Sequence, residues 1–145
     1  MRRVYKFFCL PAVDKRLLVR AVILLWLIRL GQWLLPFQTL SHLLGYLIRP
    51  SKARHLGNIP SQDSIAWAVT AASRYVFKVT CFTKALTLRV LLQKQGYDVT
   101  LCIGVARNEE SLFQAHAWVE SQGKVLIGGS EREHYIPLLK REERR

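Results

Sequence analysis

The amino-acid sequence predicts an α+β domain, in which helices come first and a small antiparallel sheet packs against one of them. Apolar residues recur at helical spacing before Gly96, and their period changes to two after it. The resulting order of helix, helix, strand, strand, strand favours an antiparallel sheet over alternating βαβ units. A chain of 145 residues, 50% of them hydrophobic, can bury one core but leaves little room for a second independent domain.

Residues 1–50 are predicted to form an N-terminal apolar helical region ahead of that domain. This region is apolar on nearly every helical face, and Gly31 and Pro36 should divide it into two helices. Its longest uninterrupted apolar run, residues 21–28, is far shorter than the roughly 20 residues of a membrane-spanning helix. The helical pair must still be covered, by the rest of the domain, by a partner protein or by a membrane surface.

Residues 51–145 are predicted to form the core domain, which starts in a basic, turn-rich linker at residues 49–60. Ser61 is placed to cap a helix over residues 62–76. Asp63 would lie in its first turn, where a negative side chain interacts favourably with the partial positive charge of the helix N-terminus. The core domain is therefore expected to open on a capped helix.

A second core helix is predicted to start after Thr80, which can cap it, and to end at Gly96, which suits a helix C-terminus. Its apolar stripe repeats at helical spacing through Cys81, Ala85, Leu88 and Leu92. Cys81 is therefore expected in the first turn, facing inward.

Three short strands are predicted beyond Gly96. They cover residues 98–106, 112–120 and 124–128, with a turn at Gln122-Gly123 between the last two. The tail "KREERR", residues 140–145, is a mixed-charge run that is expected to be solvated or frayed.

The middle strand contains "QAHAWVES", in which neighbouring side chains point to opposite faces of the sheet. His116 shares its face with Gln114, Trp118 and Glu120, whereas small and apolar residues occupy the other face. His116 therefore belongs to a polar and aromatic face rather than to a plain core stripe.

Cys81 and His116 together suggest an activated thiol. A helix N-terminus favours the thiolate, and an imidazole from a neighbouring strand can take the thiol proton and later protonate a leaving amine. Each residue also has an ordinary structural explanation, because a lone cysteine on an apolar stripe is more often packing and a strand histidine is often only hydrogen bonded. Gln114 is either an oxyanion donor or a solvent-facing glutamine.

The three cysteines, Cys9, Cys81 and Cys102, contain no C-x-x-C pair, which argues against a disulfide framework or a zinc knuckle and fits a reducing compartment. Cys102 is expected to be packing and Cys9 incidental. A zinc site would have to gather Cys81, Cys102, His116 and His134 from scattered positions, so no metal and no cofactor is expected. A cytoplasmic location follows, with membrane association left open.

The net charge of +12 should attract acidic peptides, nucleic acid or an anionic membrane surface. Nucleic acid has the least support, because no recognition-helix pattern and no strand rich in aromatic and basic residues accompanies the charge. We therefore expect no nucleic-acid partner, and peripheral membrane contact stays open.

Several motifs of the core domain follow one another in a distinctive order. A cysteine opens a helix, "LLQKQGYDVTLCIGV" leads from that helix into a strand, and "AHAWVE" is followed by "QGKVLIGG". In this order and spacing, residues 81–129 resemble the transglutaminase-like cysteine peptidases of lasso-peptide biosynthesis. The "IAWAVTAASRY" helix and the apolar N-terminal region are also similar to the form of that family in which peptidase and leader-binding module are separate proteins.

The resemblance implies a transglutaminase-like or papain-like core that removes the leader from a ribosomally made precursor peptide. It assigns Cys81 as the nucleophile and His116 as the general base and acid. The implied partners are the precursor peptide, a small leader-binding protein that presents it, and a macrolactam synthetase that closes the ring on the freed N-terminus.

The chain departs from the family at the third catalytic position. Relatives often carry an aspartate on the strand after the histidine, where this sequence has Gly128 and Gly129. Such a carboxylate would orient the imidazole and stabilise its charged form. Glu120 is four residues along the strand from His116, roughly 13 Å away and too far. Glu131 or Glu133, just beyond the glycines, could fold back towards His116, and Glu131 is taken as the candidate, although an exposed charged loop explains this segment equally well.

Two other kinds of function stay open. The same Cys81 and His116 pair would serve another acyl-transfer enzyme, such as a transglutaminase or an amide hydrolase. The basic charge and the apolar helices would also suit a non-catalytic module that binds a peptide.

Overall fold

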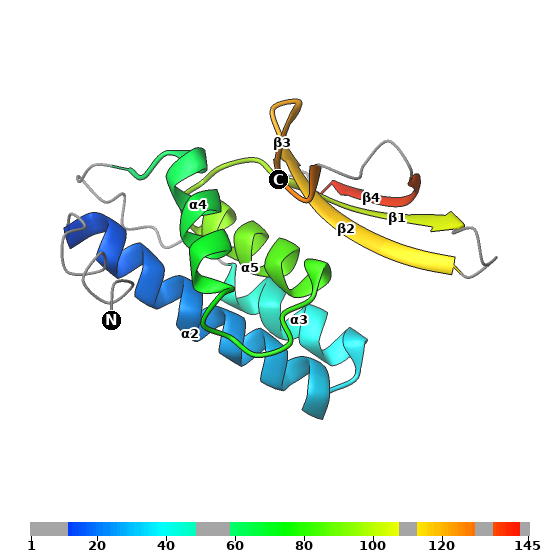
Figure 1. Ribbon diagram of the computed structural model, residues 1–145, viewed down its shortest axis with the longest axis horizontal. Helices are drawn as coiled ribbons and strands as arrows, with labels where there is room; N and C mark the ends of the chain where they lie inside the picture. Colours follow the sequence, from blue (N-terminus) through cyan, green and yellow to red (C-terminus); the bar gives the residue numbers. More distant parts are fainter. Residues whose placement is uncertain (1–11, 49–58, 108–112, 130–134, 143–145) are drawn as a thin grey trace.

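The computed structural model describes residues 12–48, 59–107, 113–129 and 135–142 of the chain. The helices are α2 (Ala12–Leu34), α3 (Phe37–Leu47), α4 (Gln62–Ala72) and α5 (Cys81–Lys94), and the strands are β1 (Thr100–Arg107), β2 (Phe113–Ser121), β3 (Lys124–Ile127) and β4 (Ile136–Glu142). Figure 1 shows the helices packed together on one side of the sheet, with α2 and α3 beneath α5 and the sheet above it. The predicted α+β class is confirmed.

The sheet is antiparallel, with the strand order β3-β2-β1-β4. In its centre, His116 of β2 lies opposite Gly104 of β1. The predicted turn between β2 and β3 is confirmed, and both of its residues, Gln122 and Gly123, have positive φ angles of 50° and 79°. Turns of this kind match the right-handed twist of the strands that they join.

The edge strand β4 was not predicted. Its backbone pairs with β1 from Val105 opposite Ile136 to Thr100 opposite Glu142. Residues 140–142 are therefore part of the sheet, and the expectation of a frayed tail is wrong for them. An edge strand is held by backbone hydrogen bonds on one side only, so charged residues can form it without apolar alternation.

Helix α4 begins at its predicted cap, Ser61, but ends four residues earlier than predicted. Near its end, the Thr70 hydroxyl donates to the carbonyl of Ala66 and the Ser73 hydroxyl donates to the carbonyl of Thr70. Such side-chain bonds compete with the helical backbone bonds. Helix α5 has the predicted start and end, since Thr80 caps it and Gly96 follows it with a φ angle of 87°.

Helix α2 continues through Gly31, so the two N-terminal helices are divided at Pro36 alone. Gly31 has another role, because a Cβ atom there would lie 2.8 Å from Cδ1 of Leu40 in α3. The missing side chain lets α3 fold back closely against α2. By length and composition, α2 would be able to cross a membrane over Asp14–Leu34.

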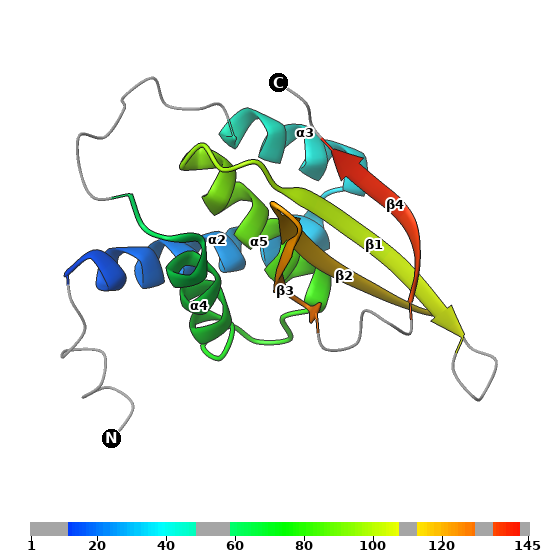
Figure 2. The same cartoon turned by 90° about the horizontal axis from the view of Figure 1, so that it is seen from above.

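One side of α2 is part of the main core. It packs across α4 and α5, and its residues Leu17, Ala21, Leu25 and Ile28 are buried there. Helix α5 lies between α2 and the sheet (Figure 1), and the view from above in Figure 2 shows β3 near α4. The helical pair is therefore covered by its own domain on that side. The domain boundary predicted near residue 50 falls outside the described residues and stays a prediction.

Candidate active site

Cys81 is the first residue of α5. Thr80 caps the helix: its hydroxyl oxygen accepts a hydrogen bond from the N–H of Thr83 at 3.2 Å, and its carbonyl accepts one from the N–H of Lys84 at 3.1 Å. Within the described ranges no acceptor is found for the N–H of Cys81 itself. A thiol and an available N–H therefore occupy the positive end of this helix.

The side chain of Cys81 is half-buried, whereas the other members of its stripe, Ala85, Leu88 and Leu92, are fully buried. The rest of the stripe faces inward as predicted, and Cys81 at its start is only partly covered. Partial exposure is what a nucleophile needs, because a fully buried thiol could not reach a substrate.

The first turn of α5 is fixed to α2 by a hydrogen bond that the sequence did not reveal. The buried hydroxyl of Thr83 donates to Oε1 of Gln32 at 2.9 Å. Since that hydroxyl has a single hydrogen, the 2.9 Å contact between the Thr80 and Thr83 hydroxyls is donated by Thr80. This chain of hydrogen bonds holds the start of α5, and Cys81 with it, against the N-terminal helix.

His116 lies in the middle of β2, with its ring half-buried. Its Nε2 atom is 2.9 Å from the carbonyl oxygen of Gly128. A carbonyl oxygen only accepts, so Nε2 carries the hydrogen, and in the neutral ring Nδ1 is then the unprotonated nitrogen. The hydrogen bond to Gly128 therefore orients the His116 ring through Nε2, and Nδ1 is the nitrogen that can accept a proton.

An aromatic cluster supports the His116 ring. The ring of Tyr135 lies 5.0 Å away between centroids, and the ring of Trp118 lies 6.3 Å away in a stacked arrangement. Trp118 is buried, and its Nε1–H donates to Oε1 of Glu120 at 2.9 Å. Buried neighbours of this kind restrict the rotamers available to an imidazole.

Two glycines make room for this arrangement. A Cβ atom at Gly104 would lie 2.9 Å from the Trp118 ring, so the indole covers a bare stretch of β1. Gly128 has a φ angle of 78°, and a Cβ atom there would lie 2.8 Å from the carbonyl oxygen of Ala117 and 3.2 Å from Nε2 of His116. A side chain at Gly128 would displace the very carbonyl that holds His116.

Helix α5, which begins at Cys81, packs against the face of β2 opposite to the one that carries His116. His116 shares the sheet face of Trp118, whereas Ala117 and Val119 on the other face join the main core with α5. Within the part of the chain that the structure describes, no hydrogen bond joins the Cys81 thiol to the His116 ring.

The other candidates have different outcomes. Glu131 and His134 lie outside the described residues, so a third catalytic role for Glu131 stays a prediction. Gln114 is exposed on β2. Cys102 is buried beside Trp118 and Tyr135, which confirms that it serves packing. Among the described residues, no group of three or more His, Cys, Asp or Glu side chains is arranged to hold a metal ion.

Sequence reasoning missed Gln32, Gly104 and Tyr135 as parts of this site. Gly104 had a signal, because a glycine inside a strand often marks the close approach of another group. Gln32 and Tyr135 had none, since each acts through a contact with a residue far away in the sequence.

Comparison with protein families identifies the superfamily of the chain. The family model described as the transglutaminase-like superfamily matches residues 18–140, a span that includes Cys81, His116 and all the helices and strands named above for most of their length. The comparisons with curated proteins and with solved structures found no match. Proteins of this superfamily are usually peptidases or acyltransferases that use a cysteine. The chain belongs to the transglutaminase-like superfamily.

Proposed function

We propose that this protein is a cysteine peptidase that removes the leader from the precursor of a lasso peptide. The observation that carries the proposal is the hydrogen bond from Nε2 of His116 to the carbonyl of Gly128. It leaves Nδ1 as the base of a ring set on the strand against which the Cys81 helix packs. A half-buried thiol at a helix start and such an imidazole are the nucleophile and the general base that an acyl-transfer enzyme of the cysteine type requires.

The reaction begins when Nδ1 of His116 takes the proton of the Cys81 thiol. The thiolate attacks the carbonyl carbon of the last leader residue, and the N–H of Cys81 donates a hydrogen bond to the oxyanion that forms. Collapse of this intermediate breaks the C–N bond, and the imidazolium gives its proton to the leaving amine of the core peptide. Water, deprotonated by the same imidazole, then hydrolyses the thioester and releases the leader.

Proton transfer requires Nδ1 and the thiol sulfur to approach within hydrogen-bond reach. Catalytic hydrogen bonds are often long in an enzyme without substrate and tighten in the complex. In the proposed complex, the start of α5 and the His116 ring, which lies on the β2 face away from α5, come within this reach around the bound precursor.

The Gly128 carbonyl takes the orienting role that a carboxylate has in related triads. Like a carboxylate, it accepts the hydrogen of Nε2 and selects the tautomer. Unlike a carboxylate, it carries no formal charge, and a neutral acceptor gives roughly half the hydrogen-bond strength of a charged one. The proposed enzyme is therefore well oriented, but its imidazolium is less stabilised than one beside an aspartate.

The choice of substrate rests on the resemblance of residues 81–129 to the leader peptidases of lasso-peptide biosynthesis. In such a system a leader-binding protein delivers the precursor, and a macrolactam synthetase uses the amine that cleavage releases. Cleavage of the precursor by this protein would supply that amine.

The test is mass spectrometry of a lasso precursor peptide incubated with the protein, with and without the leader-binding protein of the same system. We expect cleavage at one bond, stimulated by the leader-binding protein and lost in Cys81→Ala. Cys102→Ala is the matched control, because it removes the same thiol from a buried position and should keep cleavage.

Other outcomes would redirect the assignment. Transfer of the acyl group to an added amine in preference to water would identify a transglutaminase. Cleavage that persists in Cys81→Ala would remove Cys81 as the nucleophile. Absence of any cleavage by folded protein with its leader-binding partner would favour a non-catalytic peptide-binding module.

A further inference from the structure

We propose that the exposed side of α2 binds the surface of an anionic membrane and holds the enzyme there. The α2 outer face is the exposed apolar stripe of this helix, opposite the side that packs in the core. It consists of Val19, Ile23, Trp26, Leu27, Leu30, Trp33 and Leu34. This inference is independent of the chemistry at Cys81.

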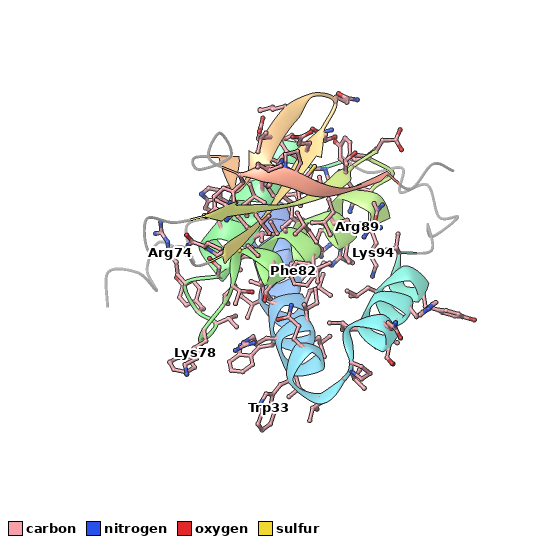
Figure 3. The ribbon with its side chains drawn as sticks, turned by 90° about the vertical axis from the view of Figure 1, so that its right-hand side faces the viewer. Trp33, Arg74, Lys78, Phe82, Arg89 and Lys94 are labelled. Atoms are coloured by element: carbon pink, nitrogen blue, oxygen red, sulfur yellow. The ribbon has the colours of Figure 1, made fainter. Side chains whose placement is uncertain are left out.

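The α2 outer face is continuous and large. Its members recur along the helix at spacings that keep them on one side, so they line that side from Val19 to Leu34. Trp33, with 82% of its surface exposed, is the most prominent of them. Figure 3 shows Trp33 projecting from the end of α2, away from the sheet. Water-exposed apolar stripes of this extent mark a surface that binds something apolar.

The charges around this face identify the occupant. Val19 and Leu30 lie nearly in line, since eleven residues make about three helical turns, so their neighbours Arg20 and Arg29 lie about 100° to either side of the stripe. The acidic residue of α2 is Asp14, in its first turn. The stripe is thus flanked by cations, as in helices that lie on anionic lipid.

Other occupants fit less well. A second copy of the chain would bring the same flanking arginines and a net charge of +12 against an equal charge. A lipid surface accepts this pattern, because arginine stems can lie along the apolar zone while their guanidinium groups reach phosphate. Indole rings such as those of Trp26 and Trp33 concentrate at the same boundary.

The helix should lie on the membrane rather than cross it. Its other side packs against α4 and α5 through Leu25 and Ile28, which are almost fully buried. A crossing helix would draw α4 and α5 into the hydrocarbon, with exposed charges such as Asp63 and Lys94. An interfacial position exposes the apolar stripe to lipid and leaves the core intact.

This binding mode would also place the active site. Gln32, the neighbour of Trp33, holds Thr83 in the first turn of α5. The C-terminal end of α2, where Trp33 would enter the membrane surface, is therefore also the end that is fixed to the Cys81 helix. Bound precursor would be processed close to the lipid surface.

The test is flotation of the full chain with vesicles of equal parts phosphatidylglycerol and phosphatidylcholine, compared with vesicles of phosphatidylcholine alone. We expect the protein to float with the anionic vesicles and largely to remain behind with the neutral ones, and salt to weaken binding. Binding to anionic vesicles should shift Trp fluorescence to shorter wavelength, because Trp26 and Trp33 leave water.

Matched variants locate the surface. Leu34→Glu should abolish flotation, whereas Ile136→Glu on β4 should not. The two residues are similarly exposed, Leu34 at 63% and Ile136 at 71%, so the variants differ mainly in their position. Arg20→Gln should weaken binding roughly fivefold, from the contribution of one cation near an anionic surface. Arg74→Gln removes one exposed charge elsewhere and should have a smaller effect.

Three results would overturn the proposal. These are an absence of flotation with anionic vesicles, binding that Leu34→Glu and Ile136→Glu lower equally, and a dimer in light scattering that Leu34→Glu dissociates while vesicles bind nothing. The last result would instead make the α2 outer face an interface between copies. Circular dichroism checks that each variant is folded, and Arg20→Gln keeps the test decisive should Leu34→Glu fail to fold.

Discussion

The first turns of α4 and α5 are built in the same way but offer different groups to their surroundings. Ser61 accepts a hydrogen bond from the N–H of Ser64 at 3.2 Å, and Thr80 accepts one from the N–H of Thr83 at 3.2 Å. In each turn a further 2.9 Å hydrogen bond joins the two hydroxyl groups. A short local pattern thus sets the backbone of both helix starts.

The residues that follow the caps make the difference. In α4, Gln62 donates to the hydroxyl of Ser121 and Asp63 forms a salt bridge with Lys124, so this start is fastened to the sheet. In α5, Cys81 follows the cap, and the first turn has no acidic residue. The positive end of the helix is matched by a carboxylate in α4 and remains available to a thiolate in α5. One helix start holds the fold together, and the other presents a reactive group.

Replacing the first residue of each helix tests this contrast with the largest expected effect. Cys81→Ala should lower precursor cleavage at least on the order of 10³-fold with little change in thermal stability, because the proposed nucleophile is lost. Gln62→Ala should keep the cleavage rate and lower the free energy of unfolding by about 1 kcal/mol, since it loses one hydrogen bond. Kinetics and thermal unfolding of both variants measure this, and slowed cleavage in Gln62→Ala would erase the contrast.

Strand β2 carries Ser121, which binds the start of α4, and His116, the proposed base for Cys81, and this gives the second test. His116→Ala should lower the cleavage rate roughly 10²- to 10⁴-fold, as expected for the loss of a general base. Ser121→Ala, which removes a buried hydroxyl bound to Gln62 and to the carbonyl of Asp98, should act mainly on stability. A full cleavage rate in His116→Ala would show that another group takes the thiol proton.

Substitutions at Gly128 and Gly129, which follow β3, test whether the Gly128 carbonyl orients His116. Gly128→Ala should lower the free energy of unfolding by about 1–3 kcal/mol, because its φ is positive and its Cβ would meet the Ala117 carbonyl, and should slow cleavage as His116 loses its acceptor. In Gly129→Ala the new Cβ would meet a methyl group of Val125 at 3.0 Å, which can move. Equal cleavage rates in the two variants would argue against the orienting role of Gly128.

The two capping residues give a smaller and more symmetrical effect. Ser61→Ala and Thr80→Ala should each lower the free energy of unfolding by about 1 kcal/mol, the usual contribution of an N-cap. Only Thr80→Ala should also reduce cleavage, by several-fold, because it loosens the turn that carries Cys81. Denaturant unfolding and kinetics on the same samples measure both, and equal loss of cleavage in Ser61→Ala would contradict a local effect.

The smallest effect is expected from the exposed salt bridge of α4. Asp63→Asn should change the free energy of unfolding by no more than about 0.5 kcal/mol, because the bridge to Lys124 is exposed and screened by water. Cleavage should be unchanged. A larger loss of stability in denaturant unfolding would show that this bridge does more to hold α4 on the sheet than its exposure indicates.

The parts of the fold that local sequence determines were predictable. Ser61 and Thr80 marked the helix starts because a cap bonds within its own turn, and the alternation around His116 revealed which face of β2 it shares. Strand β4 was missed because its pairing depends on β1, far away in the sequence. The bond from Thr83 to Gln32 was missed for the same reason.

The third catalytic position shows another limit of prediction. The search for a carboxylate led to Glu131, whereas His116 is bound in the described structure by a backbone carbonyl. Every residue has such a carbonyl, so its use leaves no mark in the side-chain pattern. The one trace was negative, since Gly128 stands where relatives often have an acid and its lack of a side chain permits the close approach.

The most direct test of the central claim is to trap the thioester. The protein is mixed with the proposed substrate, a lasso precursor peptide, and with the leader-binding protein of the same system, then quenched in acid, digested and mapped by tandem mass spectrometry. We expect the mass of the leader acyl group on the fragment that contains Cys81, and none on Cys102. An adduct on another cysteine, or cleavage without any adduct that continues in Cys81→Ala, would contradict the assignment of Cys81 as the nucleophile.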